Sequence, residues 1–239
     1  MSGFDESVLT PEHRASILAK AYASVDLLLR NTSEGDVNGD GNKWRLEIDR
    51  QDLRLTVFNS EAKGSPIRRF KAVCLLPDIS PDELMSFICD SHHRLTWDRN
   101  IRNLTLLQLA NNEQGKVSVL RSATKQVGPI SGRDFVDATI ILKRPDGSIV
   151  NCGSGLEAAE CCGLFPPTGD FVRGFNQAGT GWHVEPLESG GSRVNYVIQT
   201  DLKGWFTAFV INQAIGGSYI SFFEDLQKAL AQRKAKESS

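Results

Sequence analysis

The sequence predicts an α+β fold in which a curved antiparallel β-sheet wraps a long C-terminal helix. Three observations indicate this class. An amphipathic helix is expected near the start of the chain, a series of alternating apolar and polar segments separated by turn residues follows it, and a long amphipathic segment over residues 207–234 comes last. Antiparallel strands with helices at the two ends of the sequence are typical of α+β folds.

The first helix is expected over about residues 11–30. Thr10 and Pro11 suit the N-cap and first helical positions, and apolar residues recur after them at helical spacing. A polar, glycine-rich stretch then leads to alternating segments, which we interpret as strands at 44–48, 53–58 and 67–75.

A second helix is expected from Ser80 to Asp90. Ser80 suits the N-cap and Pro81 the first helical position, and acidic residues occupy the first turn, where the helix dipole favours them. A short helix over 92–97 follows. Further strands are then expected at 104–109, 117–124, 135–143, 149–154, 171–176, 181–186 and 193–201.

Length and composition indicate one domain with a sizeable core. The chain has 239 residues, 40% of them hydrophobic. We expect a single domain over residues 11–235, with flexible tails at 1–10 and 236–239. The 27 basic and 29 acidic residues leave a net charge of −2, which offers no electrostatic footprint for nucleic acid.

The sequence shows neither a membrane span nor a signal peptide. No apolar stretch approaches the roughly 18 residues that a spanning helix needs, and the first residues lack a basic start followed by an apolar core. We therefore expect a monomer in the cytoplasm, at membrane surfaces only transiently. The odd set of cysteines without CxxC spacing favours reduced thiols and no structural zinc; it comprises Cys74, Cys89, Cys152, Cys161 and Cys162.

One segment matches the calcium-loop pattern D-x-[DN]-x-[DN]-G-x5-E. Asp36, Asn38 and Asp40 supply the first three positions and Glu47 the last. Against this reading, Lys43 stands where an apolar residue normally links paired loops, and no partner loop exists. A flexible Asp/Asn/Gly connection explains the same composition, so both interpretations stay open.

No set of side chains indicates catalysis. Arg133 and Asp134 flank the start of a strand, where hydrogen bonding explains them. The pairs His92-His93 and Cys161-Cys162, and the solitary His183, lack metal-ligand or nucleophile partners at useful spacing. We expect no enzyme activity and no cofactor.

Four sequence blocks, in this order, resemble the START domain, the lipid-transfer domain related to the steroidogenic acute regulatory protein. They are LTWD at 95–98, SGRDFVD at 131–137, FVRGFN at 171–176 followed by EPL at 185–187, and TDLKGWF at 200–206. Their order and spacing match the family from about residue 43 to residue 233. The resemblance implies a helix-grip fold, in which a U-shaped sheet holds the last helix over an internal tunnel for one lipid.

The resemblance and the strand pattern together select candidate tunnel residues. The side chains expected to bind lipid are Leu120, Arg121, Thr139, Ile141, Ser154, Trp182, Val197, Gln199, Phe206, Phe209, Val210 and Gln213. On the last helix, Phe206, Phe209, Val210 and Gln213 can share one face. Two glycines at its centre, Gly216 and Gly217, cost about 1 kcal/mol each relative to alanine, which either close packing on the sheet or a hinge could explain.

One feature of sterol-binding relatives is missing. They often place a buried acidic and basic pair on neighbouring strands, and the matching positions here are Leu120 and Thr139. A one-residue offset would instead put Arg121 at the acidic position. Arg121 is then either a solvent-facing residue or a buried cation that binds a ligand oxygen through water.

The sequence therefore predicts a non-vesicular carrier of one hydrophobic lipid, with a sterol favoured. Membrane contact is expected at the outer edge of the last helix and the loop over residues 164–169. Two alternatives use the same cavity: a ligand-gated regulator or a small-molecule hydrolase. A phospholipid, a bile-acid-like steroid or a carotenoid would also suit an apolar tunnel.

Overall fold

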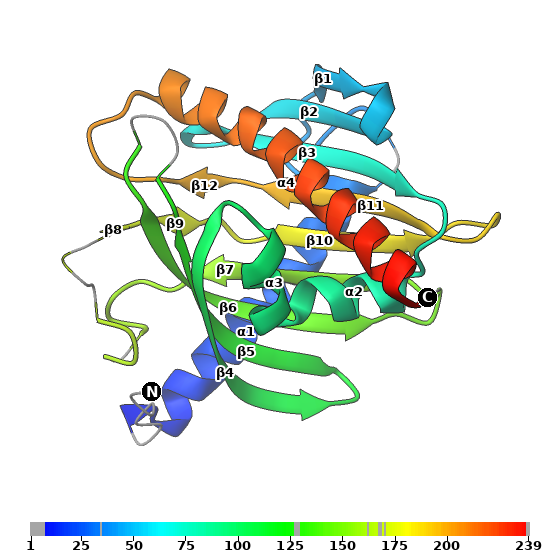
Figure 1. The fold of residues 1–239 in the computed structure, drawn as a ribbon. Helices are drawn as coiled ribbons and strands as arrows, with labels where there is room; N and C mark the ends of the chain where they lie inside the picture. The colour runs from blue at the N-terminus through cyan, green and yellow to red at the C-terminus, as the bar shows by residue number, and fades with distance from the viewer. Residues whose placement is uncertain are drawn as a thin grey trace.

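A curved antiparallel sheet forms the body of the protein (Figure 1). The computed structural model describes residues 8–33, 35–126, 130–161, 163–166, 169 and 171–237. The ten strands of the sheet are β1 Arg45–Arg50, β2 Leu55–Ala62, β3 Ser65–Leu76, β4 Ile101–Asn112, β5 Gly115–Thr124, β6 Arg133–Lys143, β7 Ile149–Gly155, β8 Val172–Arg173, β10 Thr180–Pro186 and β11 Ser192–Ile198. A separate pair joins β9 Phe175–Asn176 to β12 Thr200–Asp201.

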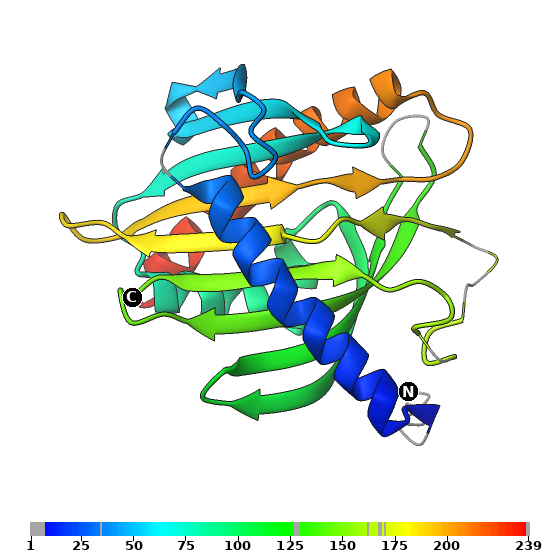
Figure 2. The ribbon, with the colours of Figure 1, turned by 180° about the vertical axis from the view of Figure 1, so that it is seen from behind.

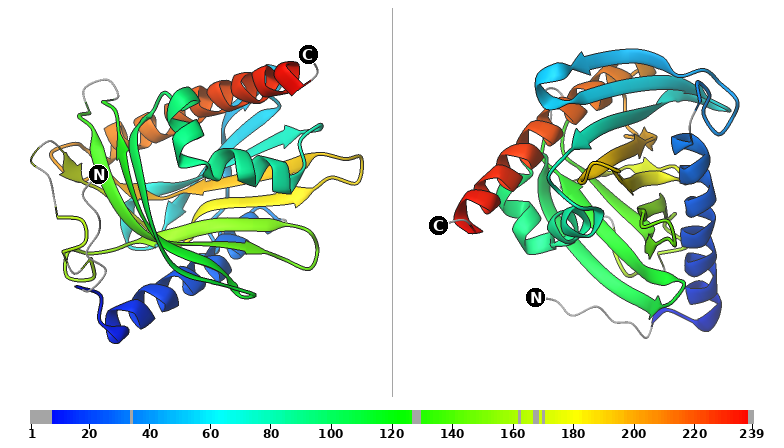
Figure 3. Two further views of the ribbon diagram at one scale, coloured as in Figure 1. Left: turned by 60° about the horizontal axis from the view of Figure 1, so that its bottom comes forward. Right: turned by 90° about the vertical axis from the view of Figure 1, so that its right-hand side faces the viewer.

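The strand order brings the two halves of the chain together in one sheet. The order is β1-β2-β3-β11-β10-β7-β6-β5-β4, with every neighbouring pair antiparallel, and the short β8 runs parallel to β6. The late strands β10 and β11 therefore lie between β3 and β7. The sheet curves around the last helix, as Figure 3 shows, which creates a concave face and a convex face.

Helix α1, Pro11–Thr32, crosses the convex face of the sheet (Figure 2). Its N-cap is Thr10, whose hydroxyl accepts a hydrogen bond from the His13 backbone N–H at 3.3 Å, and Pro11 occupies the first turn as expected. Its buried side chains, among them Ile17 and Leu28, pack on Val136 and other residues of the sheet. The convex face thus has its own hydrophobic core.

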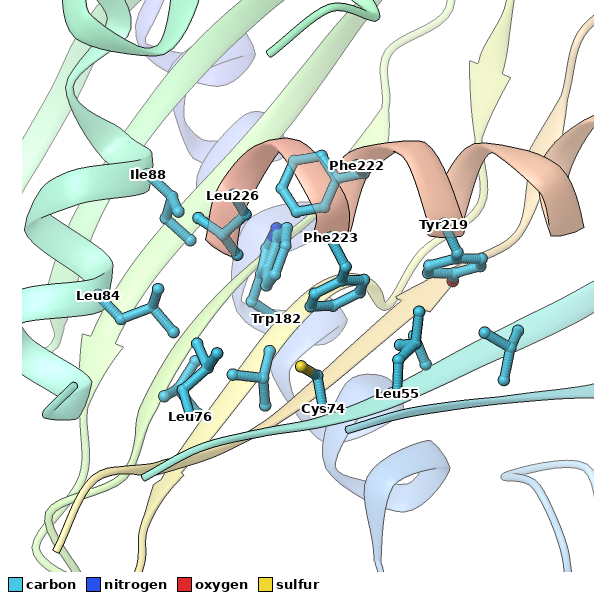
Figure 4. Packing of buried hydrophobic residues seen from close by; sticks show 14 of the residues in the cluster. Leu55, Cys74, Leu76, Leu84, Ile88, Trp182, Tyr219, Phe222, Phe223 and Leu226 are labelled. Atoms are coloured by element: carbon cyan, nitrogen blue, oxygen red, sulfur yellow. The ribbon is translucent and has the colours of Figure 1, made fainter. Parts of the chain in front are cut away.

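Three helices cover the concave face: α2 Pro81–Cys89, α3 Ser91–Trp97 and α4 Ala208–Glu237. Figure 4 shows Tyr219, Phe222, Phe223 and Leu226 of α4 pointing toward the strands. Trp182 of β10 lies in the same cluster, with its ring centroid 5.2 Å from that of Phe222. This is the helix-grip α+β architecture that the sequence predicted. None of the described helices is long and apolar enough to cross a membrane.

Most expected elements are present, and two expected strands are interrupted. The segment 171–176 divides at Gly174, whose N–H donates to the Asp134 carbonyl oxygen at 2.9 Å. A Cβ at Gly174 would lie 2.3 Å from the Phe135 ring, so only glycine allows this close approach. The segment 193–201 divides at Gln199, because Thr200 and Asp201 leave the main sheet to pair with β9.

The buried face of α4 differs from the predicted one. Ile211, Ile215 and Tyr219 are buried, whereas Phe209 is 69% exposed and Gln213 is also exposed. The prediction placed apolar residues at helical spacing on one face that includes Phe209. Because apolar residues also occur at 211 and 215, the same sequence allows a second buried face beside the first. Contacts of Tyr219, Phe222 and Phe223 with the sheet decide which of them is buried.

The two central glycines lie in an uninterrupted part of α4. A Cβ at Gly216 would lie 3.8 Å from Phe70 Cε1, an ordinary van der Waals distance, and a Cβ at Gly217 would meet no atom within 4 Å. Close packing against the sheet, one of the two explanations expected from the sequence, is therefore not what requires glycine here.

We predict that Gly217→Ala raises the free energy of unfolding by about 1 kcal/mol, because alanine loses less backbone entropy in a helix and meets no neighbouring atom. Urea denaturation followed by circular dichroism measures this. Gly216→Ala is the matched comparison and should stabilise by the same amount or less. A destabilised Gly217→Ala variant would contradict a regular helix at this position.

Candidate functional site

A cavity of about 290 Å³ lies between the concave face of the sheet and α4. Its apolar wall includes Leu104, Leu120, Phe135, Trp182 and Phe222. The volume falls at the low end of the roughly 300–1,000 Å³ typical of small-molecule sites. An apolar chamber with a few polar groups in its wall suits a compact hydrophobic ligand.

An ion pair lies in the cavity wall. Arg94 Nε of α3 is 3.0 Å from Asp98 Oδ2, and both side chains are largely buried. The Asp98 backbone N–H closes the helix by donating to the Arg94 carbonyl oxygen at 2.9 Å. The ion pair thus spans the last turn of the seven-residue helix α3. It holds the Arg94 guanidinium beside Phe222, with its carbon 5.5 Å from the ring centroid.

Asp137 is the acidic group that β6 presents to the cavity. Alternation along β6 puts Phe135, Asp137 and Thr139 on the concave side. Asp137 is 6% exposed, and its Oδ2 accepts a hydrogen bond from Asn176 Nδ2 at 3.0 Å. Its Oδ1 is buried and has no hydrogen-bond partner among the described residues. Burial raises the pKa of this carboxyl group to about 7, against the opposing effects of Asn176 and Arg173.

Arg133 ties the start of β6 to the segment that precedes α4. Its Nε donates to the Leu202 carbonyl oxygen at 2.5 Å, and its Nη1 donates to the Ser131 carbonyl oxygen at 2.7 Å. Its guanidinium carbon lies 5.6 Å from the Phe206 ring centroid. These contacts agree with the hydrogen-bonding role expected for Arg133, and they also hold the segment that leads into α4.

Asp134 forms a separate charged network on the opposite side of β6. Its carboxylate lies 2.9 Å from Arg173 Nε and 3.2 Å from Arg121 Nη2. Arg121 thus lies outside the cavity wall, with its side chain 22% exposed on the convex side, which corrects its interpretation as a buried cation that binds the ligand. Its strand partner is Val136, and both side chains point away from the cavity.

The structure brings together at the cavity wall three of the expected lipid-binding residues, Leu120, Thr139 and Trp182. Ile141 and Phe206 pack instead against the core beneath α4. Val210 is partly buried on α4 and does not line the cavity, and Phe209 and Gln213 face solvent. Phe209, Val210 and Gln213 lie outside the cavity because α4 turns the face of Ile211 and Ile215 toward the sheet.

Ser154, Val197 and Gln199 belong to the convex face, because the side chains of a strand alternate between the two faces. Ser154 pairs with Ala138 of the convex core. Val197 packs in that core, and Gln199 Oε1 accepts from Arg69 Nη2 at 2.8 Å. These three residues are therefore placed away from the cavity, which corrects their assignment to its wall.

Sequence reasoning missed Arg94, Asp98, Asp137 and Asn176. Asp137 could have been found, because it precedes Thr139 by two residues and shares its face of the strand. The other three could not, since they lie on a short helix and a short strand that only the tertiary fold brings to the cavity.

The segment with the calcium-loop pattern uses its oxygens internally. Asp40 Oδ2 pairs with Arg69 Nη1 at 3.0 Å, and Asn38 Oδ1 accepts from the Asp40 and Asn42 backbone N–H groups. Glu47 accepts a hydrogen bond from Asn59. Among the described residues, no group of three or more His, Cys, Asp and Glu side chains could hold a metal ion.

The cysteines of the described part of the chain are free thiols. Cys74, Cys152 and Cys161 are buried, Cys89 is exposed, and Cys162 lies outside the described residues. Burial raises the pKa of Cys74 and of Cys152 to about 12, which leaves both thiols protonated at neutral pH.

Comparison with known families identifies the architecture. The family model described as the START domain matches residues 29–236. The chain belongs to the START domain family. StAR-related lipid transfer protein 5 of Mus musculus is 33% identical over 141 residues, which are 57% of this chain and 62% of that protein, so the match spans less than two thirds of the relative.

Other relatives match over more of their length. StAR-related lipid transfer protein 4 of Homo sapiens is 27% identical over 212 residues, which are 87% of this chain and 97% of that protein. The solved structure of human StAR-related lipid transfer protein 5 superposes with a TM-score of 0.79 at 22% identity, covering 92% of this chain and 99% of that one. The START fold thus accounts for nearly all of the chain.

We predict that Asp137→Asn changes how stability depends on pH. The folded-state pKa of about 7 lies above the unfolded value of about 3.9. The protonated carboxyl group therefore favours folding, and this contribution is lost as the pH rises from about 4 to about 7. Asparagine does not titrate, so the free energy of unfolding of Asp137→Asn, relative to that of wild type, should increase across this window by a few kcal/mol.

Urea titrations of both proteins between about pH 4 and pH 8 measure this difference. The difference in the free energy of unfolding should be constant above about pH 8, where Asp137 of wild type is ionised in both the folded and the unfolded state. Parallel stability profiles of the variant and wild type across the whole range would show that the Asp137 pKa is not raised.

Proposed function

We propose that this START domain is a lipid carrier, which binds one hydrophobic lipid in the cavity beneath α4 and transfers it between membranes. The observation that carries the proposal is the apolar chamber between α4 and the concave face of the sheet. A fold alone does not decide function, but removing an apolar ligand from water into such a chamber is favourable. We propose further that it acts as a monomer in the cytoplasm.

A sterol is the proposed ligand. The small volume favours a compact ring system over a phospholipid with two acyl chains and a charged headgroup. Asp137 Oδ1 is a buried acceptor without a partner among the described residues, which a single ligand hydroxyl could satisfy. Here Asp137 would supply the polar contact that Leu120 and Thr139, both without charge, do not supply.

Membrane contact is proposed for the beginning of α4. Trp205 is fully exposed and Phe209 is 69% exposed, so two large apolar side chains reach solvent within one short segment. The loop expected from the sequence is different: Leu164 and Phe165 are buried in the convex core, and Pro167 and Thr168 lie outside the described residues. An exposed tryptophan suits the membrane–water interface.

Sterol binding is tested with a fluorescent sterol and native mass spectrometry. We predict that Asp137→Leu weakens sterol binding by roughly tenfold, the loss of one hydrogen bond to a buried group. Thr139→Val is the matched control, because the Thr139 hydroxyl already donates to the Ser118 carbonyl oxygen at 3.1 Å. Wild-type protein that retains phospholipid and no sterol would contradict the proposed ligand.

Transfer between liposomes tests the membrane contact. We predict that Trp205→Ala and Phe209→Ser slow transfer severalfold and leave equilibrium sterol binding unchanged, because neither side chain lines the cavity. Leu46→Ser, at an exposed apolar position on β1, is the control and should transfer at the wild-type rate. Equal rates for all three variants would place the membrane contact elsewhere.

A further inference from the structure

A second pocket lies on the convex face, across the sheet from the lipid cavity. It has a volume of about 450 Å³ and forms where the end of α1 meets β2, β3, β10 and β11. Figure 2 shows α1 crossing this face of the sheet. Its wall differs from that of the lipid cavity in being rich in charge, with Lys71, Arg144, Arg193 and His183 among its residues.

Lys71 is the central feature of this pocket. It is 7% exposed, and its Nζ lies 4.5 Å from the Trp44 ring centroid and 5.8 Å from that of Phe58. Within the part of the chain that the structure describes, no carboxylate oxygen lies within 4.0 Å of Nζ and no group accepts a hydrogen bond from it. A buried cation without a counter-charge is costly.

A neighbouring residue shows that burial on this face does not by itself leave a cation unpaired. Arg69 precedes Lys71 by two residues, points to the same face and is also buried. Its guanidinium donates to Gln199 Oε1 at 2.8 Å, to Asn31 Oδ1 at 3.1 Å and to Asp40 Oδ2 at 3.0 Å. Lys71 therefore differs from Arg69 in its surroundings: the pocket around Lys71 offers no acceptor at hydrogen-bond distance among the described residues.

A second cation faces the same space. Arg193, on β11, makes no ion pair among the described residues. Burial, and after it the charge of Arg193, lowers the pKa of Lys71 to about 8. Lys71 is thus still mainly protonated at neutral pH. Arg144 is already paired with Asp146 at 3.0 Å.

Two acidic residues also line the pocket, Asp36 and Glu185, so the formal charges of Lys71 and Arg193 are balanced, but neither carboxylate lies within 4.0 Å of Lys71 Nζ. Glu185 is the cross-strand partner of Arg193. The charge of Asp36 partly opposes the lowering of the Lys71 pKa, but Asp36 forms no ion pair with Lys71. The Glu185 carboxylate accepts a hydrogen bond from Asn195 Nδ2 at 2.7 Å.

Two further polar groups in the wall lack partners. The Trp44 indole N–H is buried without an acceptor among the described residues, and His183 Nε2 is buried there without a hydrogen-bond partner. His183 Nδ1 lies 2.9 Å from Thr32 Oγ1, and burial lowers the pKa of the imidazole, which keeps it uncharged at neutral pH. Among the described residues, the wall therefore holds one buried cation without an ion pair, Lys71, beside the Trp44 indole N–H.

We propose that this pocket is a second binding site, for a phosphate monoester carried by a small molecule or by a lipid headgroup. A phosphate monoester brings negative charge and three strong acceptor oxygens, which suit the Lys71 ammonium group and the neighbouring Trp44 indole N–H. The volume leaves room for the group that bears the phosphate. The site is separate from the lipid cavity and does not depend on the proposed carrier function.

Binding of inorganic phosphate and of glycerol phosphate to the full chain, measured by calorimetry, tests the site. Lys71→Met keeps the apolar stem and removes the charge, so it should weaken binding by roughly tenfold or more, the loss of a charge-assisted hydrogen bond. Arg193→Gln, at an exposed position, should weaken it as well. Lys63→Met removes an equal charge from the exposed β2–β3 turn and should bind as wild type does.

Vesicles distinguish the two sources of the phosphate. Binding to phosphatidylcholine vesicles that contain a phosphatidylinositol phosphate, lost in Lys71→Met and retained in Lys63→Met, would identify a lipid headgroup. Binding of soluble phosphates alone, with the same dependence on Lys71, would identify a soluble molecule. Both results support the site.

The proposal is overturned if neither probe binds, if Lys71→Met binds as tightly as wild type, or if acetate at equal ionic strength binds as well as phosphate does. Sterol binding by Lys71→Met should equal that of wild type, because Lys71 lies across the sheet from the lipid cavity. The outcome for this site is therefore independent of the outcome for lipid carriage.

Discussion

The attachment of α4 to the concave face of the sheet is the constraint on which the rest of the structure depends. The Tyr219 hydroxyl lies 3.2 Å from the Phe70 carbonyl oxygen of β3 and 3.0 Å from the Tyr196 carbonyl oxygen of β11, so one side chain of the helix spans two neighbouring strands. Phe222 and Phe223 pack beside it on Trp182. These contacts set the rotation of α4, and with it the side chains that close the cavity and those that reach solvent.

The curved sheet carries different chemistry on its two faces, because its side chains alternate. On β6, Asp137 faces the cavity with an unpaired oxygen, whereas Asp134 faces the other way and binds Arg121 and Arg173. On β3, Ala72 packs beneath α4, whereas Lys71 lies on the convex face near Trp44. The cavity beneath α4 and a charged pocket can therefore lie on opposite sides of the same strands without sharing a residue.

Local signals predicted the elements well and the site less well. Thr10 with Pro11 and Ser80 with Pro81 mark helix starts through local hydrogen bonds and a fixed backbone angle, so the sequence alone locates them. The cavity wall was harder to predict because it depends on which face of each strand is concave. Leu120 and Thr139 do line the cavity, but the same rule, applied without a known register, also selected Val197 and Gln199 of the convex face.

The sequence by itself determined the α+β class, the order of the elements and the family, because periodicity, helix caps and the order of four short sequence blocks can be read along the chain without its tertiary structure. Only the tertiary structure decided the rotation of α4 and the placement of Asp137 Oδ1 and Lys71 where, among the described residues, Oδ1 has no hydrogen-bond partner and Lys71 has no ion pair. Each of these depends on partners far away in the chain, or on their absence among the described residues. Burial and pairing are set by the packing of the whole sheet, which no local pattern records.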